Sequence, residues 1–301
     1  MGAIIAVDVG GTNTRFAVVD DNLSIVERHM YRTDPNDPKT FFKELKQFIT
    51  KSKQQVSAVG ISFPGPLDTK NGMVLTPPNL PGWHYYPIVE TVKEETGLDC
   101  SLEGDARCAG LSEAVVGAAK GFKTVFYITV STGVGSSIIR DGVIDEGDHG
   151  FAGEIANCIL WKNGPRMGSL QAGAIECIAS GTGILRRAHK EGLTVNDTKQ
   201  VFDLHKASNS VASMLIYETI DYLSNFLAIV QTIVDPSMVV MGGSVITHND
   251  WVIEEIMNSI RKKVYPDLKK SIKISVSKNK DDAGLLGAAI IAKRFVELAL
   301  T

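Results

Sequence analysis

The chain has 301 residues, a net charge of −3 and 44% hydrophobic residues. This length suits two lobes with a substantial core, because single cores stop growing near about 250–300 residues. The acidic balance gives no overall basic field for nucleic acid. No apolar run approaches the roughly 18 residues of a membrane span, and the opening residues lack a signal-peptide pattern. The cysteines form no C-x-x-C pair, so a cytoplasmic protein with reduced thiols is expected.

The first part of the chain predicts an α/β lobe that opens with hairpins. Apolar runs separated by Gly, Pro or Asp/Asn turns favour strands at 3–9, 14–20, 23–33, 56–63 and 100–103. Apolar residues at helical spacing favour helices at 39–53, 86–96 and 105–119.

The pattern then restarts, which indicates two related halves. Strands are expected at 124–130, 136–140, 143–144, 238–241 and 272–277, and helices at 210–234, 250–264 and 283–300. The Gly-rich residues 150–182 have no clear pattern. We therefore expect an N-terminal lobe of residues 1–118 plus 291–301 and a C-terminal lobe of residues 119–290.

Three Gly/Thr-rich turns follow apolar strands, at residues 8–12, 131–135 and 242–244. Glycines let backbone N–H groups approach an anion, and successive N–H groups form an anion-binding nest. Each turn alone could be a simple hairpin turn, but together they indicate a phosphate site. The chain has no G-x-x-x-x-G-K-[ST] motif, and Arg15 stands where G-x-G-x-x-G needs a glycine, which disfavours P-loop and dinucleotide-binding proteins.

Several motifs occur in a fixed order along nearly the whole chain. They are D-x-G-G-T-x-x-R at 8–15, P-G-P at 64–66, N-L-P-G-W at 79–83, an Asp at 105 before a helix, T-G-x-G-S at 132–136, and the segments 235–243 and 283–289. In these motifs the sequence resembles the ROK family of sugar kinases and related repressors. The resemblance implies an α/β fold of two ribonuclease-H-like (actin-like ATPase) lobes with an interlobe cleft for ATP and sugar. It also implies Mg²⁺ and, frequently, a homodimer.

The resemblance assigns roles to the acids and to the turns. Asp105, after a strand and at a helix start, is the expected general base and a sugar contact, although Asp is also a favoured helix N-cap. Asp8 is expected beside Mg²⁺, through water, unless it only caps its turn. Phosphate contacts are expected from Gly10, Gly11, Thr12, Thr132 and Gly133. Gly242 and Gly243 are expected to border the adenosine.

The resemblance also points to sugar ligands, namely Asn79, Glu154 and Glu176. Carboxylates suit vicinal hydroxyls because each oxygen accepts charge-assisted hydrogen bonds, although glutamates are usually solvated surface residues. Arg15 is expected either at the phosphates or in a structural ion pair. Trp83 is expected in the core rather than stacked on a sugar.

The sequence departs from the family pattern at two places. Many members bind structural zinc, but Met167, Ser169, Ala174 and Asn157 stand at the ligand positions here. No zinc is therefore expected, and packing of Trp161, Met167 and Leu170 is expected to hold this loop, with Asn157 orienting the sugar. Secondly, Gly104 precedes Asp105 where Asn is common, which removes an amide from the sugar site and leaves room there.

These observations predict an ATP-dependent, glucokinase-like hexose kinase acting on the 6-hydroxyl of glucose. Fructose, an N-acetylhexosamine or a β-glucoside remain alternative sugars, and polyphosphate an alternative donor. Two alternative functions are not enzymatic: a catalytically silent sensor of sugar or nucleotide, and a transcriptional repressor. A repressor would carry a helix-turn-helix ahead of the first phosphate strand, and a strand starting at Ala3 leaves no room for it.

Overall fold

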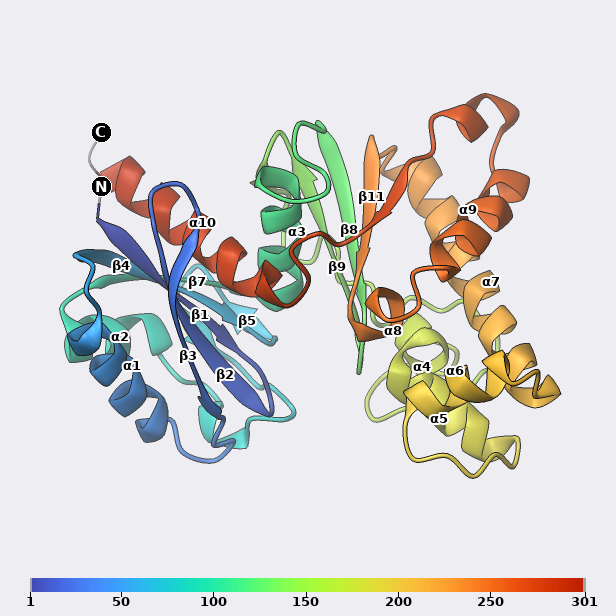
Figure 1. Ribbon diagram of the computed structural model, residues 1–301, viewed down its shortest axis with the longest axis horizontal. Coiled ribbons are helices and arrows are strands. Elements are labelled where there is room, and N and C mark those ends of the chain that lie inside the picture. The colour runs from blue at the N-terminus through green and yellow to red at the C-terminus, as the bar shows by residue number, and fades with distance from the viewer. Residues whose placement is uncertain (1, 300–301) are drawn as a thin grey trace. The chain divides into compact units, whose positions relative to one another are not determined.

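The fold consists of two compact units in the computed structural model, which describes residues 2–299 (Figure 1). Unit 1 comprises the residues up to Ser112 and those from Asp281 onward, and unit 2 comprises Glu113–Lys280. The contacts thus divide the chain at other points than the boundaries expected from the sequence, 118/119 and 290/291. At the C-terminal boundary the reason is that the last helix, α10 (Ala283–Ala299), packs against the strands of unit 1 from its first turn.

Unit 1 is built on a five-stranded sheet of order β3-β2-β1-β4-β7. Its strands are β1 (Ala3–Val9), β2 (Asn13–Val19), β3 (Ile25–Arg32), β4 (Val56–Phe63) and β7 (Asp99–Gly104). The first three strands are antiparallel neighbours, and β4 and β7 continue the sheet parallel to β1. A separate two-stranded ribbon consists of β5 (Leu67–Asp68) and β6 (Met73–Val74).

Two apolar layers cover this sheet. Because successive side chains of a strand point to opposite faces, Ile5 and Val7 of β1 face one layer while Ile4 and Ala6 face the other. The first layer holds the aromatic side chains of α1 (Lys39–Lys51) and the buried residues of α2 (Ile88–Thr96). The second holds α10 and Cys108 of α3 (Asp105–Val115).

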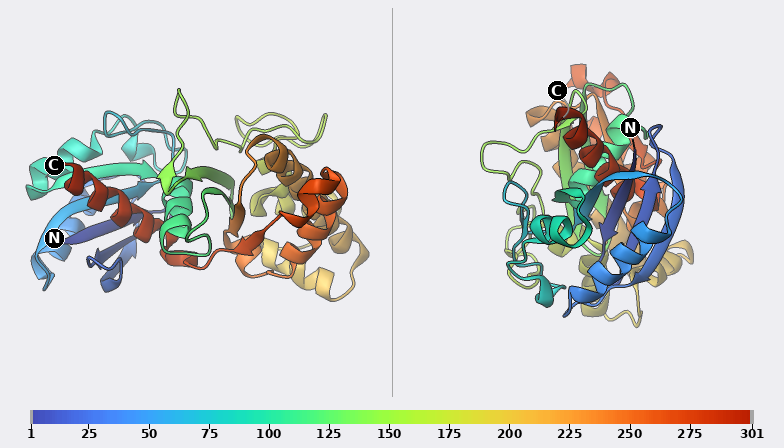
Figure 2. Two further views of the ribbon diagram at one scale, coloured as in Figure 1. Left: turned by 90° about the horizontal axis from the view of Figure 1, so that it is seen from above. Right: turned by 90° about the vertical axis from the view of Figure 1, so that its left-hand side faces the viewer.

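Helix α10 lies close against the sheet of unit 1, as Figure 2 shows. A Cβ atom on Gly60 of β4 would lie 2.0 Å from the carbonyl oxygen of Ala288. A Cβ atom on Gly287 would likewise lie 2.0 Å from the carbonyl oxygen of Cys108. These two glycines therefore set how closely α10 approaches β4 and α3.

Unit 2 repeats this sheet. Its order is β10-β9-β8-β11-β12, with β8 (Thr124–Val130), β9 (Val134–Arg140), β10 (Val143–Ile144), β11 (Met238–Gly242) and β12 (Ile274–Val276). Strands β8 to β10 are antiparallel neighbours, and β11 and β12 continue parallel to β8. The strand order and directions match those of unit 1, in line with the two related halves that the repeated sequence pattern indicates.

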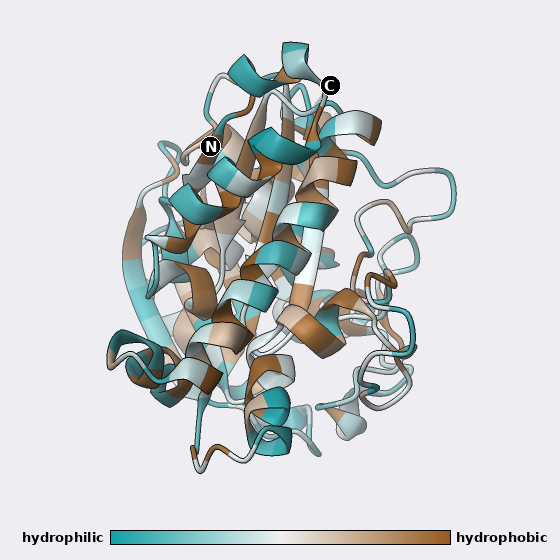
Figure 3. Cartoon of the chain, turned by 90° about the vertical axis from the view of Figure 1, so that its right-hand side faces the viewer, coloured by the Kyte–Doolittle hydropathy of each residue, from teal (hydrophilic) through white to brown (hydrophobic). Residues whose placement is uncertain are grey.

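Helices cover the unit 2 sheet and enclose one large apolar core. They are α4 (Ile175–Ala179), α5 (Gly181–Lys190), α6 (Thr198–Lys206), α7 (Ser210–Ile233), α8 (Ser244–Thr247) and α9 (Val252–Lys263). Figure 3, which shows the molecule from the right-hand side of Figure 1, shows helices in which hydrophilic and hydrophobic residues alternate in bands. In α9 the buried residues Val252, Ile256 and Ile260 recur at helical spacing and face that core.

Most predicted elements lie where the sequence placed them, within about three residues. The strands at 3–9, 56–63 and 124–130 match to the residue, whereas the helix expected to reach residue 119 ends at Val115. Residues 150–182, which had no prediction, contain α4 and the start of α5. No helix within residues 2–299 has the length and apolar character to cross a membrane.

Candidate functional site

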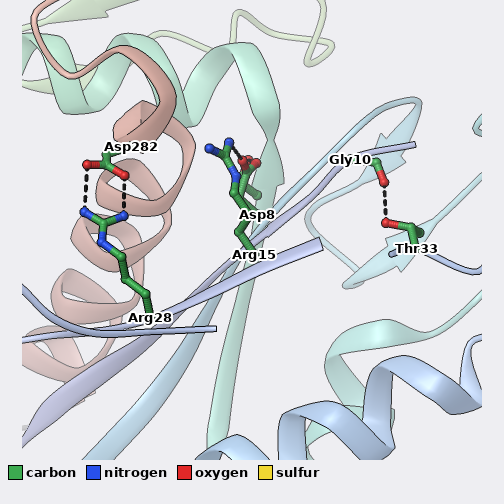
Figure 4. Close-up of polar contacts among 7 residues, drawn as sticks. Asp8, Gly10, Arg15, Arg28, Thr33 and Asp282 are labelled. Carbon is green, nitrogen blue, oxygen red and sulfur yellow. Dashed lines mark hydrogen bonds and ion pairs between the residues drawn. The ribbon is translucent and has the colours of Figure 1, made fainter. Parts of the chain in front are cut away.

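Asp8 lies near the end of β1, and its neighbours follow from strand register. Arg15 is its partner on β2, and Ser62 is its partner on β4. Directly opposed side chains of neighbouring strands lie within reach of each other. Accordingly, Arg15 forms an ion pair with Asp8 Oδ2 (Figure 4), and Ser62 Oγ donates to Asp8 Oδ1 at 2.9 Å. Of the two roles expected for Arg15, this structure contains the ion pair.

The same carboxylate also contacts the start of α10. Asp8 shares the sheet face of Ile4 and Ala6, which α10 covers. A Cβ atom on Gly284 would lie 2.6 Å from Asp8 Oδ1. A side chain at position 284 would therefore displace the Asp8 carboxylate, and the glycine leaves that carboxylate in place.

The turn after β1 is tight and open to solvent. Gly10 N–H donates to the Asn13 carbonyl at 3.0 Å, and Thr33 Oγ1 donates to the Gly10 carbonyl at 2.7 Å (Figure 4). Gly11 and Thr12 are exposed. A Cβ atom on Gly11 would lie 3.6 Å from the Asn79 Cβ. The structure thus brings one predicted sugar ligand next to the first predicted phosphate turn.

Asp105 lies on the same edge of the sheet as Asp8. Strands β1, β4 and β7 are parallel neighbours, with Asp8 paired to Ser62 and Phe63 paired to Gly104. The carboxyl ends of parallel strands meet at one edge, where α/β proteins bind ligands. Gly104 ends β7 and Asp105 is the exposed first residue of α3. A Cβ atom on Gly104 would meet nothing nearer than Arg107 Cγ and Cδ, at 4.0 Å, so there is room for a side chain.

In unit 2, the second glycine turn joins β8 to β9 and contacts Glu176. Ser131 N–H donates to the Gly133 carbonyl at 2.9 Å, which closes the turn. Val134 N–H donates to Glu176 Oε2 at 2.9 Å. A Cβ atom on Gly133 would lie 2.6 Å from that same oxygen. Glu176, predicted as a sugar ligand, therefore caps the predicted phosphate turn.

A cavity of about 200 Å³ opens beside this turn, within unit 2. Its lining combines turn residues with the starts of three helices: Ser131, Thr132, Gly181, Thr182, Leu185, Asn196, Asp197, Thr198, Ser244 and Val245. Gly181 N–H donates to the Ser131 carbonyl at 2.7 Å and Thr198 Oγ1 donates to the Gly181 carbonyl at 2.7 Å. The walls are thus tied together by hydrogen bonds, and most of the lining side chains are polar.

The third glycine turn lies at the rim of this cavity, after β11. Gly243 has a φ of +83° and precedes α8, and a Cβ atom there would lie 2.3 Å from the Val130 carbonyl oxygen. A Cβ atom on Gly242 would lie 2.4 Å from the Tyr127 hydroxyl. Both glycines are therefore needed for the turn to pack on β8, and the turn brings Ser244 within 3.1 Å of Ser131, Oγ to Oγ.

The other two predicted sugar ligands lie on the irregular segment of residues 150–174. Glu154 is exposed and follows Gly153, whose carbonyl accepts a 2.6 Å hydrogen bond from Ser136 Oγ of β9. Asn157 Oδ1 accepts from Gln171 N–H at 2.8 Å. In this structure the Asn157 side chain therefore braces its own loop. Trp83 is 1% exposed and packs edge-on against Phe41 and Phe63, which confirms the expected core position.

The residues that line the turns fit a nucleotide and a hydrated cation. Each of the three turns has a glycine at which a Cβ atom would lie less than 3.0 Å from a neighbouring protein atom, and a glycine-rich turn can offer backbone N–H groups to an anion. Asp8 offers a carboxylate beside the first turn. Within residues 2–299 no group of three or more His, Cys, Asp or Glu side chains is arranged to hold a metal ion by itself. A cation held by one carboxylate, its own waters and phosphate oxygens agrees with how Mg²⁺ is usually bound.

Sequence reasoning missed several residues of these sites. Ser62 has no local signal, because its position opposite Asp8 depends on the register of a parallel strand pair. By contrast, the cavity residues at the starts of α5 and α6 did have a local sequence signal. Ser180 accepts from Gly183 N–H and Asp197 accepts from Gln200 N–H, and such Ser and Asp residues mark helix N-termini in a sequence.

The two α/β units, with a glycine turn at the carboxyl edge of each sheet, have the actin-like ATPase fold of ROK sugar kinases. The family model described as "ROK family" matches residues 4–295, and the chain belongs to this family. Among curated relatives it is 27% identical to a glucokinase of Thermotoga maritima, covering 96% of this chain and 97% of that protein. It is 31% identical to an N-acetylmannosamine kinase of Citrobacter koseri, covering 96% and 98%.

Solved structures of the family resemble the chain along its whole length. A ROK hexokinase from Thermus thermophilus has a TM-score of 0.88 at 29% identity and covers 98% of this chain and 99% of that chain. A ROK family glucokinase from Streptomyces griseus, in complex with glucose and AMPPNP, has a TM-score of 0.81 at 26% identity. It covers 97% of this chain and 100% of that chain.

Proposed function

We propose that this protein is an ATP-dependent hexose kinase that transfers the γ-phosphoryl group to the 6-hydroxyl of glucose. The observation that carries this proposal is the register of β1, β4 and β7, which puts Asp8 and Asp105 on one carboxyl edge of the unit 1 sheet. A cation site and a base on one edge are what phosphoryl transfer needs, since its catalysis is positioning and charge stabilisation.

Asp105 is the proposed general base. It is exposed at the start of α3, and its carboxylate would accept the proton of the sugar hydroxyl as that oxygen attacks phosphorus. Asn79 lies beside the first turn, where its amide would hold a sugar hydroxyl within reach of the phosphates. Gly104 leaves open space next to the base.

The glycine turns are the proposed phosphate contacts. Gly10, Gly11 and Thr12 would serve this role in unit 1, and Thr132 and Gly133 in unit 2. Gly242 and Gly243, at the rim of the unit 2 cavity, would border the adenosine. Asp8 would hold the waters of Mg²⁺, whose charge offsets that of the phosphates when bound. ATP is the expected donor, and the AMPPNP in the related Streptomyces griseus glucokinase supports it.

The remaining sugar contacts are proposed on unit 2. Glu154 and Glu176 would accept hydrogen bonds from hydroxyls, and the Asn157 amide would add a donor. Asn157 departs from the family pattern, and the chain is 31% identical to an N-acetylmannosamine kinase. An N-acetylhexosamine is therefore the second candidate substrate, favoured by the space at Gly104. We further expect the enzyme to act in the cytoplasm as a homodimer.

The test is a coupled assay of ADP release with Mg²⁺-ATP and a panel of sugars. The panel comprises glucose, fructose, mannose, N-acetylglucosamine, N-acetylmannosamine and cellobiose, and NMR of the product locates the new phosphate ester. We expect glucose-dependent release and a 6-phosphate. Release with N-acetylmannosamine alone would favour the second candidate. Binding of sugar or ATP without release from any sugar would contradict the kinase and favour a sensor.

A further inference from the structure

The irregular segment of residues 150–174 carries two of the proposed sugar ligands yet contains no long helix or strand. Backbone hydrogen bonds join the middle of this segment to its C-terminal end. Ile175 N–H donates to the Cys158 carbonyl at 2.8 Å, and Leu160 N–H donates to the Gly173 carbonyl at 2.9 Å. Two arms, residues 156–161 and 171–176, therefore run side by side, and we call this pair the ligand loop.

Trp161 fixes the outer end of the ligand loop. The backbone N–H of Trp161 donates to the Gly173 carbonyl at 3.2 Å. Gly173 has a φ of +77°, and a Cβ atom there would lie 1.7 Å from the Trp161 carbonyl oxygen. The backbones of the two arms thus touch at this point. The position of Trp161 consequently sets the position of the arm that leads into Glu176.

The Trp161 ring stacks on α7. It lies nearly parallel to the Tyr222 ring, at 17°, with 5.8 Å between centroids. The Arg187 guanidinium of α5 lies over both rings, 5.9 Å from the Trp161 centroid and 5.6 Å from the Tyr222 centroid. A guanidinium at this distance is attracted to the negative faces of aromatic rings.

Arg187 is itself firmly held. It is 5% exposed and forms an ion pair with Glu218 of α7. Its Nη1 donates to the Ile178 carbonyl of α4 at 3.0 Å and to Thr219 Oγ1 at 3.3 Å. Burial lowers the pKa of Arg187, and the attraction of Glu218 opposes that shift, so the guanidinium remains charged. Arg187 therefore connects α4, which carries Glu176, with α7 and the Trp161 ring.

We propose that the stack of Trp161, Arg187 and Tyr222 fastens the ligand loop, and that Trp161 is a positioning residue for sugar binding. This inference rests on the proposed function, because Glu154, Asn157 and Glu176 are sugar ligands only in that proposal. Trp161 is itself neither a proposed sugar ligand nor a proposed phosphate contact. It acts by holding Asn157 and the arm before Glu176 in one arrangement, and a small displacement of positioned groups is costly for binding and rate.

The first test needs no substrate. In Trp161→Ala, hydrogen exchange measured by mass spectrometry should quicken by about tenfold or more at Gln171, Gly173 and Ile175, whose N–H groups bond within the segment. Trp161→Phe keeps a ring on Tyr222 and should restore slow exchange. The matched control is Trp251→Ala, which removes a tryptophan that stacks on His205 elsewhere in unit 2, and it should leave these amides unchanged.

The second test measures kinetics with glucose and N-acetylmannosamine as probes. Trp161→Ala should raise the KM for the sugar by about tenfold and leave the KM for ATP within about twofold, with rescue by Trp161→Phe. If Trp161→Ala does not fold, Tyr222→Leu removes the opposite ring and should show the same pattern.

The two proposals fail in different ways. Unchanged exchange in Trp161→Ala and Tyr222→Leu overturns the fastening role, whether or not the parent phosphorylates a sugar. Quickened exchange with an unchanged sugar KM overturns the positioning role. Quickened exchange in Trp161→Ala, combined with a parent protein that phosphorylates no sugar, supports the fastening role and contradicts the proposed kinase instead.

Discussion

The backbone N–H of Val134 donates to Glu176 Oε2 at 2.9 Å, so a proposed sugar ligand is fixed to a proposed phosphate turn. Gly133, in that turn, has no Cβ to displace the same oxygen. Within unit 2, therefore, this hydrogen bond connects the proposed sugar side of the site with its proposed phosphate side.

Glu176→Gln should separate these two roles of the side chain. The amide oxygen can still accept from Val134 N–H, so we expect the free energy of unfolding to stay within about 0.5 kcal/mol. The loss of charge-assisted hydrogen bonds to the sugar should lower kcat/KM for the sugar by about 10²-fold. Glu176→Ala should also destabilise the protein by about 1–3 kcal/mol, because it leaves Val134 N–H without this acceptor. Full activity in Glu176→Gln would argue against sugar contact.

Gly104→Asn should fit the structure and change sugar preference. The nearest atoms to an added Cβ are 4.0 Å away, and Gly104 is not among the described residues with positive φ. An amide there would add about one hydrogen bond to a bound hexose, so kcat/KM for glucose relative to N-acetylmannosamine should rise about fivefold. Gly104→Ala, which fills space without an amide, is the control. Equal effects of both variants would mean that only volume matters.

Glu113→Gln should destabilise unit 2 strongly. Glu113 is fully buried, and its carboxylate accepts hydrogen bonds from Ala118 N–H, Lys278 N–H, Asn279 N–H and Ser277 Oγ, at 2.6–3.2 Å. In the sequence, Ala118 lies near one point where the chain passes between the units, 112/113, and residues 277–279 lie near the other, 280/281.

A glutamine presents an NH₂ group to some of these donors, so urea denaturation should show a loss of about 3 kcal/mol. Ser277→Ala, which removes one donor, should cost about 1–2 kcal/mol. The exposed Glu191→Gln, in the same unit, should cost less than about 0.5 kcal/mol. A Glu113→Gln variant as stable as Glu191→Gln would contradict the importance of this buried carboxylate.

One thiol of the native protein should react readily with a disulfide reagent. Cys158 is exposed, whereas Cys100, Cys108 and Cys177 are buried, and burial raises the pKa of the Cys100 and Cys108 thiols. Partial burial also raises the pKa of Cys158. Since only the thiolate reacts, the rate should increase from pH 7 to pH 9. Cys158→Ser should abolish the fast reaction, and a second fast thiol in that variant would contradict the buried positions.

Much of the fold is local in origin and therefore predictable. The hairpin of β1 and β2 follows from two apolar runs on either side of a glycine turn, and its register puts Arg15 opposite Asp8. The same pattern in β8 and β9 indicated a second half, which the matching strand orders display. The family resemblance supplied the site residues, and whether they act as proposed remains a prediction.

The rest depends on contacts between residues that are distant in sequence. The ligand loop has no periodic pattern in its sequence, and Trp161 is held there by Arg187 and Tyr222, which come from two helices further along the chain. Ser62 reaches Asp8 only through the parallel pairing of β1 and β4. Packing of Trp161, Met167 and Leu170 was expected to hold the loop, and both Met167 and Leu170 do pack on the unit 2 core.

The most direct test of the proposed kinase is sugar-dependent ADP release by Asp105→Asn beside the parent, with ATP affinity measured on both. Asparagine keeps the shape of the side chain but cannot take the hydroxyl proton. We expect a loss of about 10²- to 10⁴-fold in kcat with ATP affinity unchanged. An Asp105→Asn enzyme within about tenfold of the parent would contradict Asp105 as the base and, with it, the central assignment of the unit 1 edge as the site of phosphoryl transfer.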